Sequence, residues 1–122
     1  MERIQYYTNQ IELAEKQEDF NWEENDIEEK KIQNQIDELK YLIKAKKRSP
    51  AQRVLINHMP GYRLKFEIMI EEKEREIEKL EGRIENNNYM VYCCSRRIVS
   101  HVRELTYKIR QIEDELNNNV NF

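Results

Sequence analysis

The side chains best suited to chemistry are two histidines and two cysteines, and their spacing favours neither metal binding nor nucleophilic catalysis. His58 and His101 lie far apart in the sequence, and neither belongs to an HExxH or a paired-cysteine zinc pattern. No GxSxG turn presents a nucleophile, and no glycine-rich loop is available to hold a phosphate. The sequence therefore predicts a protein that is not an enzyme, with no catalytic residue, no metal site and no cofactor.

The two cysteines are neighbours in the sequence, and two arginines follow them closely. Arg96 and Arg97 would favour a reactive thiolate at Cys93 or Cys94, but the interpretation we favour is one cysteine in the core and an inert neighbour. Adjacent residues on a helix point about 100° apart, so the pair does not form an ordinary disulfide. Reduced thiols, together with an N-terminus that lacks an apolar signal core, predict a cytoplasmic protein.

The composition predicts long, solvated helices. Charged residues make up 37% and hydrophobic residues 39% of the 122 residues, and only two glycines and two prolines are present to form the turns of a sheet protein. No apolar run approaches the roughly 18 residues of a membrane span, so we expect no membrane contact. We predict an all-α fold, an antiparallel coiled-coil-like bundle that forms one domain over residues 1–122.

Residues 1–47 contain no glycine or proline and are predicted to form a long first helix. Apolar side chains at steps of three and four give two stripes, which are Ile4, Tyr7, Ile11 and Ala14, and then Ile32, Ile36, Leu39 and Ile43. The register between these stripes is poor. Asn21 with Glu24 matches a capping box, so two interpretations stay open: one continuous helix, or a break within residues 19–22.

The rest of the chain is expected to form a short corner helix and a C-terminal helical hairpin. Ser49 and Pro50 begin a short helix over 50–57, and Pro60 with Gly61 separates it from a helix over 62–85. The asparagines at 86–88 predict a turn, followed by a helix over 89–117 and a tail over 118–122. The stripe of the last helix consists of Val91, Cys94, Ile98, Val102, Leu105, Ile109, Ile112 and Leu116.

Helix lengths in this arrangement predict an unpartnered N-terminal segment. At about 1.5 Å per residue, the first helix would be roughly 69 Å long and its neighbour over 62–85 roughly 36 Å. The N-terminal stripe would then overhang and require a partner, most simply a second copy in a homodimer. The candidate partner interface consists of Ile4, Tyr7, Ile11, Phe20 and Trp22.

Charge is strongly segregated although the net charge is only −3. Residues 1–38 carry twelve acids and four bases, whereas residues 39–66 carry eight bases and no acid. The candidate basic contact surface consists of Lys44, Lys46, Lys47, Arg48, Arg53, Arg63 and Lys65. A solvated face explains such charge most simply, and the functional interpretations are contact with an acidic protein or with nucleic acid. The corner loosely resembles a helix-turn-helix, but Glu67 and Glu71 follow at once and would repel DNA.

These observations favour a non-enzymatic protein–protein interaction module whose protein partner is not identified. The composition is typical of an AT-rich genome, so one hypothesis is a phage or mobile-element accessory protein that acts as a regulator or inhibitor of a host protein. One alternative is a nucleic-acid-binding accessory factor that uses the basic corner over 44–65. A second alternative is a self-assembling structural or scaffold element.

Overall fold

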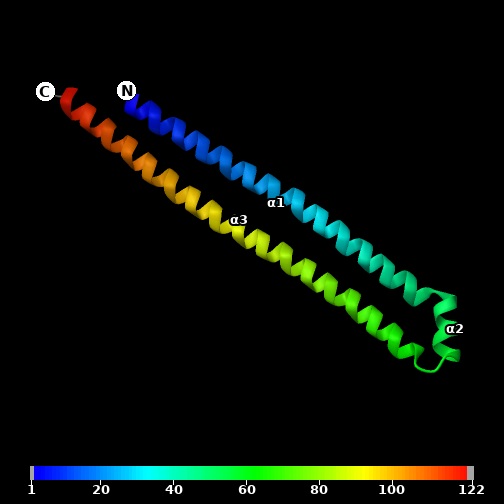
Figure 1. The fold of residues 1–122 in the computed structure, drawn as a ribbon. Helices are drawn as coiled ribbons and strands as arrows, with labels where there is room; N and C mark the ends of the chain where they lie inside the picture. Colours follow the sequence, from blue (N-terminus) through cyan, green and yellow to red (C-terminus); the bar gives the residue numbers. More distant parts are fainter. Residues whose placement is uncertain (1, 121–122) are drawn as a thin grey trace. The chain divides into compact units, whose positions relative to one another are not determined.

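The computed structural model describes residues 2–120, which form three helices (Figure 1). They are α1 (Glu2–Arg48), α2 (Pro50–His58) and α3 (Tyr62–Val120). The chain divides into two compact units: the first combines the residues up to Asn25 with those from Asn88 onward, and the second runs from Asp26 to Asn87. Within each unit a segment of α1 lies beside an antiparallel segment of α3. The predicted all-α, antiparallel fold class is confirmed.

Local backbone chemistry positions α2 at the corner of the second unit. Ser49 has an extended backbone and its Oγ accepts a hydrogen bond from the Gln52 amide at 3.4 Å, while Pro50 occupies the first turn. The helix ends where the Met59 amide donates to the Leu55 carbonyl at 2.9 Å. Gly61 then adopts a left-handed φ of 81°, which favours glycine. The short helix predicted for 50–57 is confirmed and extends one residue further.

The core of the second unit is built from the predicted isoleucine stripe of α1. Ile32 and Ile36 are each only 1% exposed. The buried cluster consists of Ile32, Ile36, Ile43, Ile70, Ile77 and Leu80, with Leu39, Phe66 and Ile84 packed against it. Burying each such side chain stabilises the fold by about 1.5–3 kcal/mol, so this cluster holds the two helices together.

Helix α1 is continuous, so the alternative of a break within residues 19–22 is wrong. Asn21 does not cap a new helix, because its Oδ1 accepts a hydrogen bond from the Gln17 side chain at 2.8 Å. The stripe continues through polar residues at steps of four and three, namely Glu18, Asn21 and Asn25. Two of these bind α3: Ser95 donates to Glu18, and the Asn25 Nδ2 donates to the Asn88 Oδ1 at 2.6 Å. The poor apolar register therefore marks a polar layer and not an interruption.

Helix α3 is also continuous, and the turn predicted at 86–88 is wrong. Asparagine inside a helix costs only about 0.7 kcal/mol relative to alanine, which packing on either side exceeds. The contact stripe crosses this segment by two successive steps of four residues, from Leu80 to Ile84 and from Ile84 to Asn88. A second step of four, where the regular pattern has a step of three, locally unwinds a supercoil and keeps the stripe facing its neighbour. One helix therefore replaces the predicted C-terminal hairpin.

The first unit contains a thinner core than the second. Leu105 and Ile112 are 5% and 7% exposed, whereas Leu116 is 41% exposed, so its predicted place in the core stripe is wrong. Cys94 is exposed as well, because Ser95 occupies the contact position beside Glu18. Residues 118–120 of the predicted tail continue α3, and residues 121–122 lie outside the described residues.

The predicted overhang of the N-terminal stripe is also wrong, because α3 has 59 residues and α1 has 47. In the first unit, Ile4, Tyr7, Ile11 and Ala14 are half-buried. Lys108 of α3 places its Nζ 5.6 Å from the centre of the Tyr7 ring. The C-terminal part of α3 therefore lies beside the N-terminal stripe of α1, for which the sequence predicted no neighbour within the chain.

Candidate functional site

The predicted basic residues all lie in the second unit, on the end of α1, on α2 and on the start of α3. We call this surface the basic corner; it consists of Lys44, Lys46, Lys47, Arg48, Arg53, Arg63 and Lys65. Six of the seven are exposed. Lys46 is half-buried, with its Nζ 3.1 Å from the Met69 Sδ across the helix pair. Three helices therefore supply residues to one continuous surface.

Most of this charge is not neutralised by neighbouring acids. Arg63 pairs with Glu67 at 3.3 Å, and both side chains are largely exposed. Within residues 2–120, none of the other six basic-corner residues takes part in an ion pair. Because both side chains are exposed, this pair contributes little to stability, and the charge on the other six residues is not paired with an acid.

Helix dipoles explain part of the charge but not all of it. Lys46, Lys47 and Arg48 occupy the last turn of α1, where cations favour the negative end of the helix dipole. Arg63 and Lys65 lie in the first turn of α3, which contains no acid. Cations there meet the positive end of the dipole, an unfavourable position by about 0.3–1 kcal/mol. The helix dipole therefore does not account for the bases on α3, although Arg63 gains from its pair with Glu67 one turn further on.

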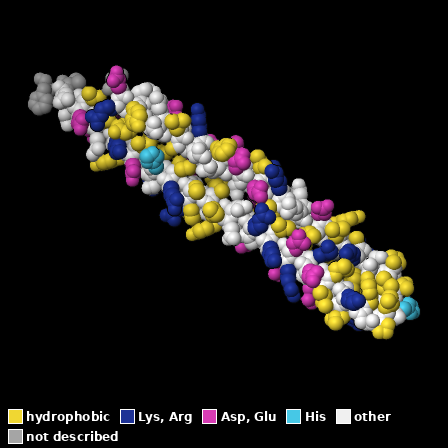
Figure 2. Space-filling view, viewed as in Figure 1, with side chains coloured by type: hydrophobic (Ala, Val, Ile, Leu, Met, Phe, Trp, Pro, Cys, Tyr) yellow, Lys and Arg dark blue, Asp and Glu magenta, His cyan; other side chains and the backbone are white. Residues whose placement is uncertain are grey.

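Apolar side chains are exposed among these bases (Figure 2). Helix α2 has no buried residue. Val54, Met59, Leu64 and Ile68 are 55%, 53%, 62% and 46% exposed. The corner therefore combines exposed apolar side chains with unpaired positive charge, which is typical of a binding surface.

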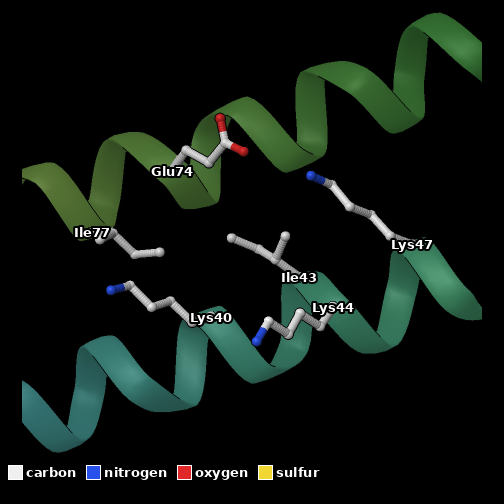
Figure 3. A pocket seen from close by; sticks show the side chains of 6 residues that line it. All are labelled: Lys40, Ile43, Lys44, Lys47, Glu74 and Ile77. Atoms are coloured by element: carbon white, nitrogen blue, oxygen red, sulfur yellow. The ribbon is translucent and has the colours of Figure 1, made fainter.

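A shallow groove of about 370 Å³ continues the basic corner along α1 and α3 (Figure 3). It is lined by Lys40, Ile43, Lys44, Lys47, Glu74 and Ile77. Figure 3 shows Ile43 and Ile77 pointing toward each other between the helices, with the lysines on α1 and Glu74 on α3. Both isoleucines are 8% exposed and form an apolar floor, and the lining surface of the groove is mostly apolar although three lysines border it.

The candidate partner interface predicted on α1 is not a single surface. Ile4, Tyr7 and Ile11 are half-buried in the first unit, whereas Phe20 and Trp22 are 55% and 37% exposed. The predicted interface did not include Tyr6 or Leu13, although these side chains are 60% and 59% exposed. The signal for them is their spacing, because Tyr6, Leu13 and Phe20 follow one another at steps of seven.

The cysteines and arginines in the middle of α3 are arranged around tyrosines. Cys93 is half-buried and Cys94 exposed. The Arg96 guanidinium lies 5.9 Å from the centre of the Tyr92 ring. A hydrogen bond with Cys93, followed by charge interaction with the same thiol, raises the pKa of Tyr89 above its usual value. Arg96 is therefore engaged by an aromatic ring beside the cysteines.

Within residues 2–120 the structure shows neither a metal-ligand cluster nor a membrane-spanning helix. No three histidine, cysteine, aspartate or glutamate side chains gather in a way that would hold a metal ion. In the same range, no helix is both long and apolar enough to cross a bilayer.

Comparison with known proteins gives no relative: no family model, no curated protein and no solved structure matches this chain.

Proposed function

We propose that this protein is a non-enzymatic interaction module that binds an acidic, amphipathic segment of another protein through its basic corner. The observation that carries the proposal is the exposed apolar patch at α2 and the start of α3, which lies among bases that make almost no ion pairs. An amphipathic helix with leucine-type side chains on one face and acids at its edges would bury the patch and pair with the bases.

The exposed apolar side chains favour a protein over nucleic acid. Contact with phosphates requires lysine and arginine, and it gains little from Leu64 or Val54. Beyond its first turn, α3 also exposes Glu67 and Glu71, which would repel a duplex that lies along the helix. A protein segment uses both halves of the surface, because it supplies apolar contacts together with carboxylates.

The test is binding of a fluorescent acidic amphipathic peptide, with acids at its edges and leucines at helical spacing, measured by anisotropy. Leu64→Ser removes an apolar contact and Arg53→Glu reverses a charge, and each should weaken binding about tenfold or more. Tyr107→Ser is the matched apolar control, because Tyr107 is 62% exposed, as is Leu64, but lies in the first unit. Unchanged affinity in both corner variants would refute the proposal.

Nucleic acid is the competing outcome of the same experiment. Duplex and single-stranded DNA are titrated at about 50 and 200 mM salt, where binding through phosphates falls steeply as salt rises. Micromolar DNA binding that Arg53→Glu abolishes and Leu64→Ser leaves intact, without peptide binding, would overturn the proposal in favour of the nucleic-acid alternative over 44–65.

We further propose that the chain forms a homodimer, because hydrophobic side chains stay exposed on α1 as well as at the corner. A closed dimer has one mass at all concentrations above its dissociation constant, whereas a self-assembling scaffold grows with concentration. Light scattering over a concentration series separates the two. The hypothesis of a phage or mobile-element protein that regulates a host protein stays a prediction from composition.

A further inference from the structure

A second line of exposed side chains runs along α1 within the first unit, separate from the stripe beside α3. Tyr6, Leu13 and Phe20 are 60%, 59% and 55% exposed. Gln10 and Gln17 fall between them, so the five positions follow at steps of four, three, four and three. This is the spacing at which one helix contacts another along its length.

The charge along this line is unusual for the chain. No charged residue occupies the five positions from Tyr6 to Phe20, although 37% of all residues are charged. Continuing the same steps outward reaches Arg3 at one end and Glu24 at the other. We call the set the α1 seam; it consists of Arg3, Tyr6, Gln10, Leu13, Gln17, Phe20 and Glu24. Opposite charges at the two ends favour pairing with a copy of the helix in the reverse direction, because each positive end then meets a negative one.

We propose that the α1 seam binds the α1 seam of a second copy, with the two helices antiparallel and Leu13 on the twofold axis. The layers of this pair are then arranged symmetrically about Leu13. Leu13 meets Leu13 at the centre, and Gln10 meets Gln17 of the second copy on either side. The next layers place Tyr6 against Phe20, an aromatic pair, and the outermost place Arg3 against Glu24. Each contact away from the axis occurs twice, as an isologous interface requires, and the Leu13 contact on the axis occurs once.

The opposite orientation is disfavoured by the same residues. In a parallel pair each residue meets its own copy, so Arg3 would lie against Arg3 and Glu24 against Glu24. Like charges in such positions are destabilising, whereas the antiparallel pair converts both contacts into attractions. The seam therefore determines the direction of pairing as well as the partner.

The first test is the mass of the protein, measured by light scattering and sedimentation from about 1 to 500 μM. Leu13→Lys places two ammonium groups together on the axis and should raise the dimer dissociation constant at least tenfold. Tyr107→Lys is the matched control, since Tyr107 is 62% exposed but lies on α3 and off the seam. Circular dichroism shows whether each variant keeps its helices. A monomer throughout this range, or equal effects of the two variants, would overturn the proposal.

Charge reversal tests the direction of pairing without touching the apolar side chains. Arg3→Glu or Glu24→Arg alone should weaken the dimer several-fold, and the double variant should restore it, because both end contacts are then reversed together. In a parallel dimer like charges face each other in the wild type and in every variant, so neither single variant would weaken the dimer and the double variant would have nothing to restore. A dimer that neither single variant weakens contradicts the assigned register.

Cross-linking tests the layers one by one in a Cys93→Ser, Cys94→Ser background. Oxidation by copper phenanthroline should link Leu13→Cys to itself across the axis. Tyr6→Cys should link only when mixed with Phe20→Cys, and neither should link alone. Self-linking of Tyr6→Cys would show a parallel pair and would refute the proposal. Since the basic corner belongs to the second unit, Leu13→Lys should leave peptide binding at the corner unchanged, so failure of one proposal is distinguishable from failure of the other.

Discussion

The amide pair that joins α1 to α3 offers a direct test of the polar layer in the first unit. Asn25 is 7% exposed, and its Nδ2 donates to the Asn88 Oδ1 at 2.6 Å. Asn88→Ala removes the acceptor and leaves a buried donor without a partner. The unmet desolvation cost of such a group is about 1–3 kcal/mol. Replacing both residues by leucine removes the buried polar groups together, so the double variant should be about as stable as the wild type or more so.

Helix propensity must be separated from the hydrogen bond, because alanine is a better helix former than asparagine by about 0.7 kcal/mol. Asn21→Ala is the matched control. It gains the same propensity, and the bond it loses is one within α1, in which Gln17 donates to Asn21 at 2.8 Å. Pairs at that spacing contribute only about 0.2–0.5 kcal/mol. Asn88→Ala should therefore be less stable than Asn21→Ala by roughly 1–3 kcal/mol.

Urea unfolding followed by circular dichroism at 222 nm measures both effects. With a slope of about 2 kcal/mol per molar urea, a difference of 2 kcal/mol moves the midpoint by about 1 M. Equal midpoints for Asn88→Ala and Asn21→Ala would show that the amide pair is solvated and would refute the buried polar layer. A double leucine variant less stable than Asn88→Ala would contradict the same reasoning, because it would show that the site does not accept apolar side chains.

Three further stability predictions use the same urea assay. Ile36→Ala should cost about 2–5 kcal/mol because Ile36 is 1% exposed, whereas Leu116→Ala should change stability by about 0.5 kcal/mol because Leu116 is 41% exposed; equal losses would contradict the assigned core. Gly61→Ala should lower the free energy of unfolding by about 1–2 kcal/mol, since Gly61 holds a left-handed φ of 81°. Gly82→Ala should raise the free energy of unfolding by about 1 kcal/mol, because Gly82 lies inside α3 and an added Cβ meets nothing within 4 Å. The two glycine variants must differ in sign for the described backbone to be correct.

Sequence reasoning located the strongest parts of the fold because they depend on apolar periodicity and on local turn chemistry. The stripe through Ile32, Ile36 and Ile43 forms the core of the second unit, and Ser49 with Pro50 begins α2. It failed where polar residues occupy the contact stripe. Asn86–Asn88 were interpreted as a turn because asparagine is common at helix ends, yet Asn88 faces Asn25 across the helix pair. A count of contact positions at steps of three and four, regardless of polarity, would have found the continuous helix.

The candidate site was predictable only in part. The basic corner follows from a sequence segment that lacks acids, so its residues could be named before the fold was known. The exposure of Val54 and Leu64 could not be predicted from the sequence. It depends on how α2 crosses the end of the helix pair without burying any residue. The α1 seam was missed because Tyr6 and Leu13 recur at steps of seven, and that spacing is sparser than the core pattern and is visible only when the core positions are already assigned.

Contacts between α1 and α3 are separated by growing lengths of chain. Lys46 and Met69 are 23 residues apart, Asn25 and Asn88 are 63 apart, and Glu18 and Ser95 are 77 apart. Closing the longest of these loops directly costs about 1 kcal/mol more entropy than closing the shortest. Folding should therefore nucleate beside α2 and proceed like a zipper toward the two termini, since each closed layer shortens the loop that the next must close.

The first unit is the last to close on this route, and it carries the thinner core together with the α1 seam. A second copy bound at the seam would hold this closing segment in its helical state. Association and the final step of folding would then be thermodynamically linked, so that dilution of the protein loosens the terminal half of the helix pair before the corner.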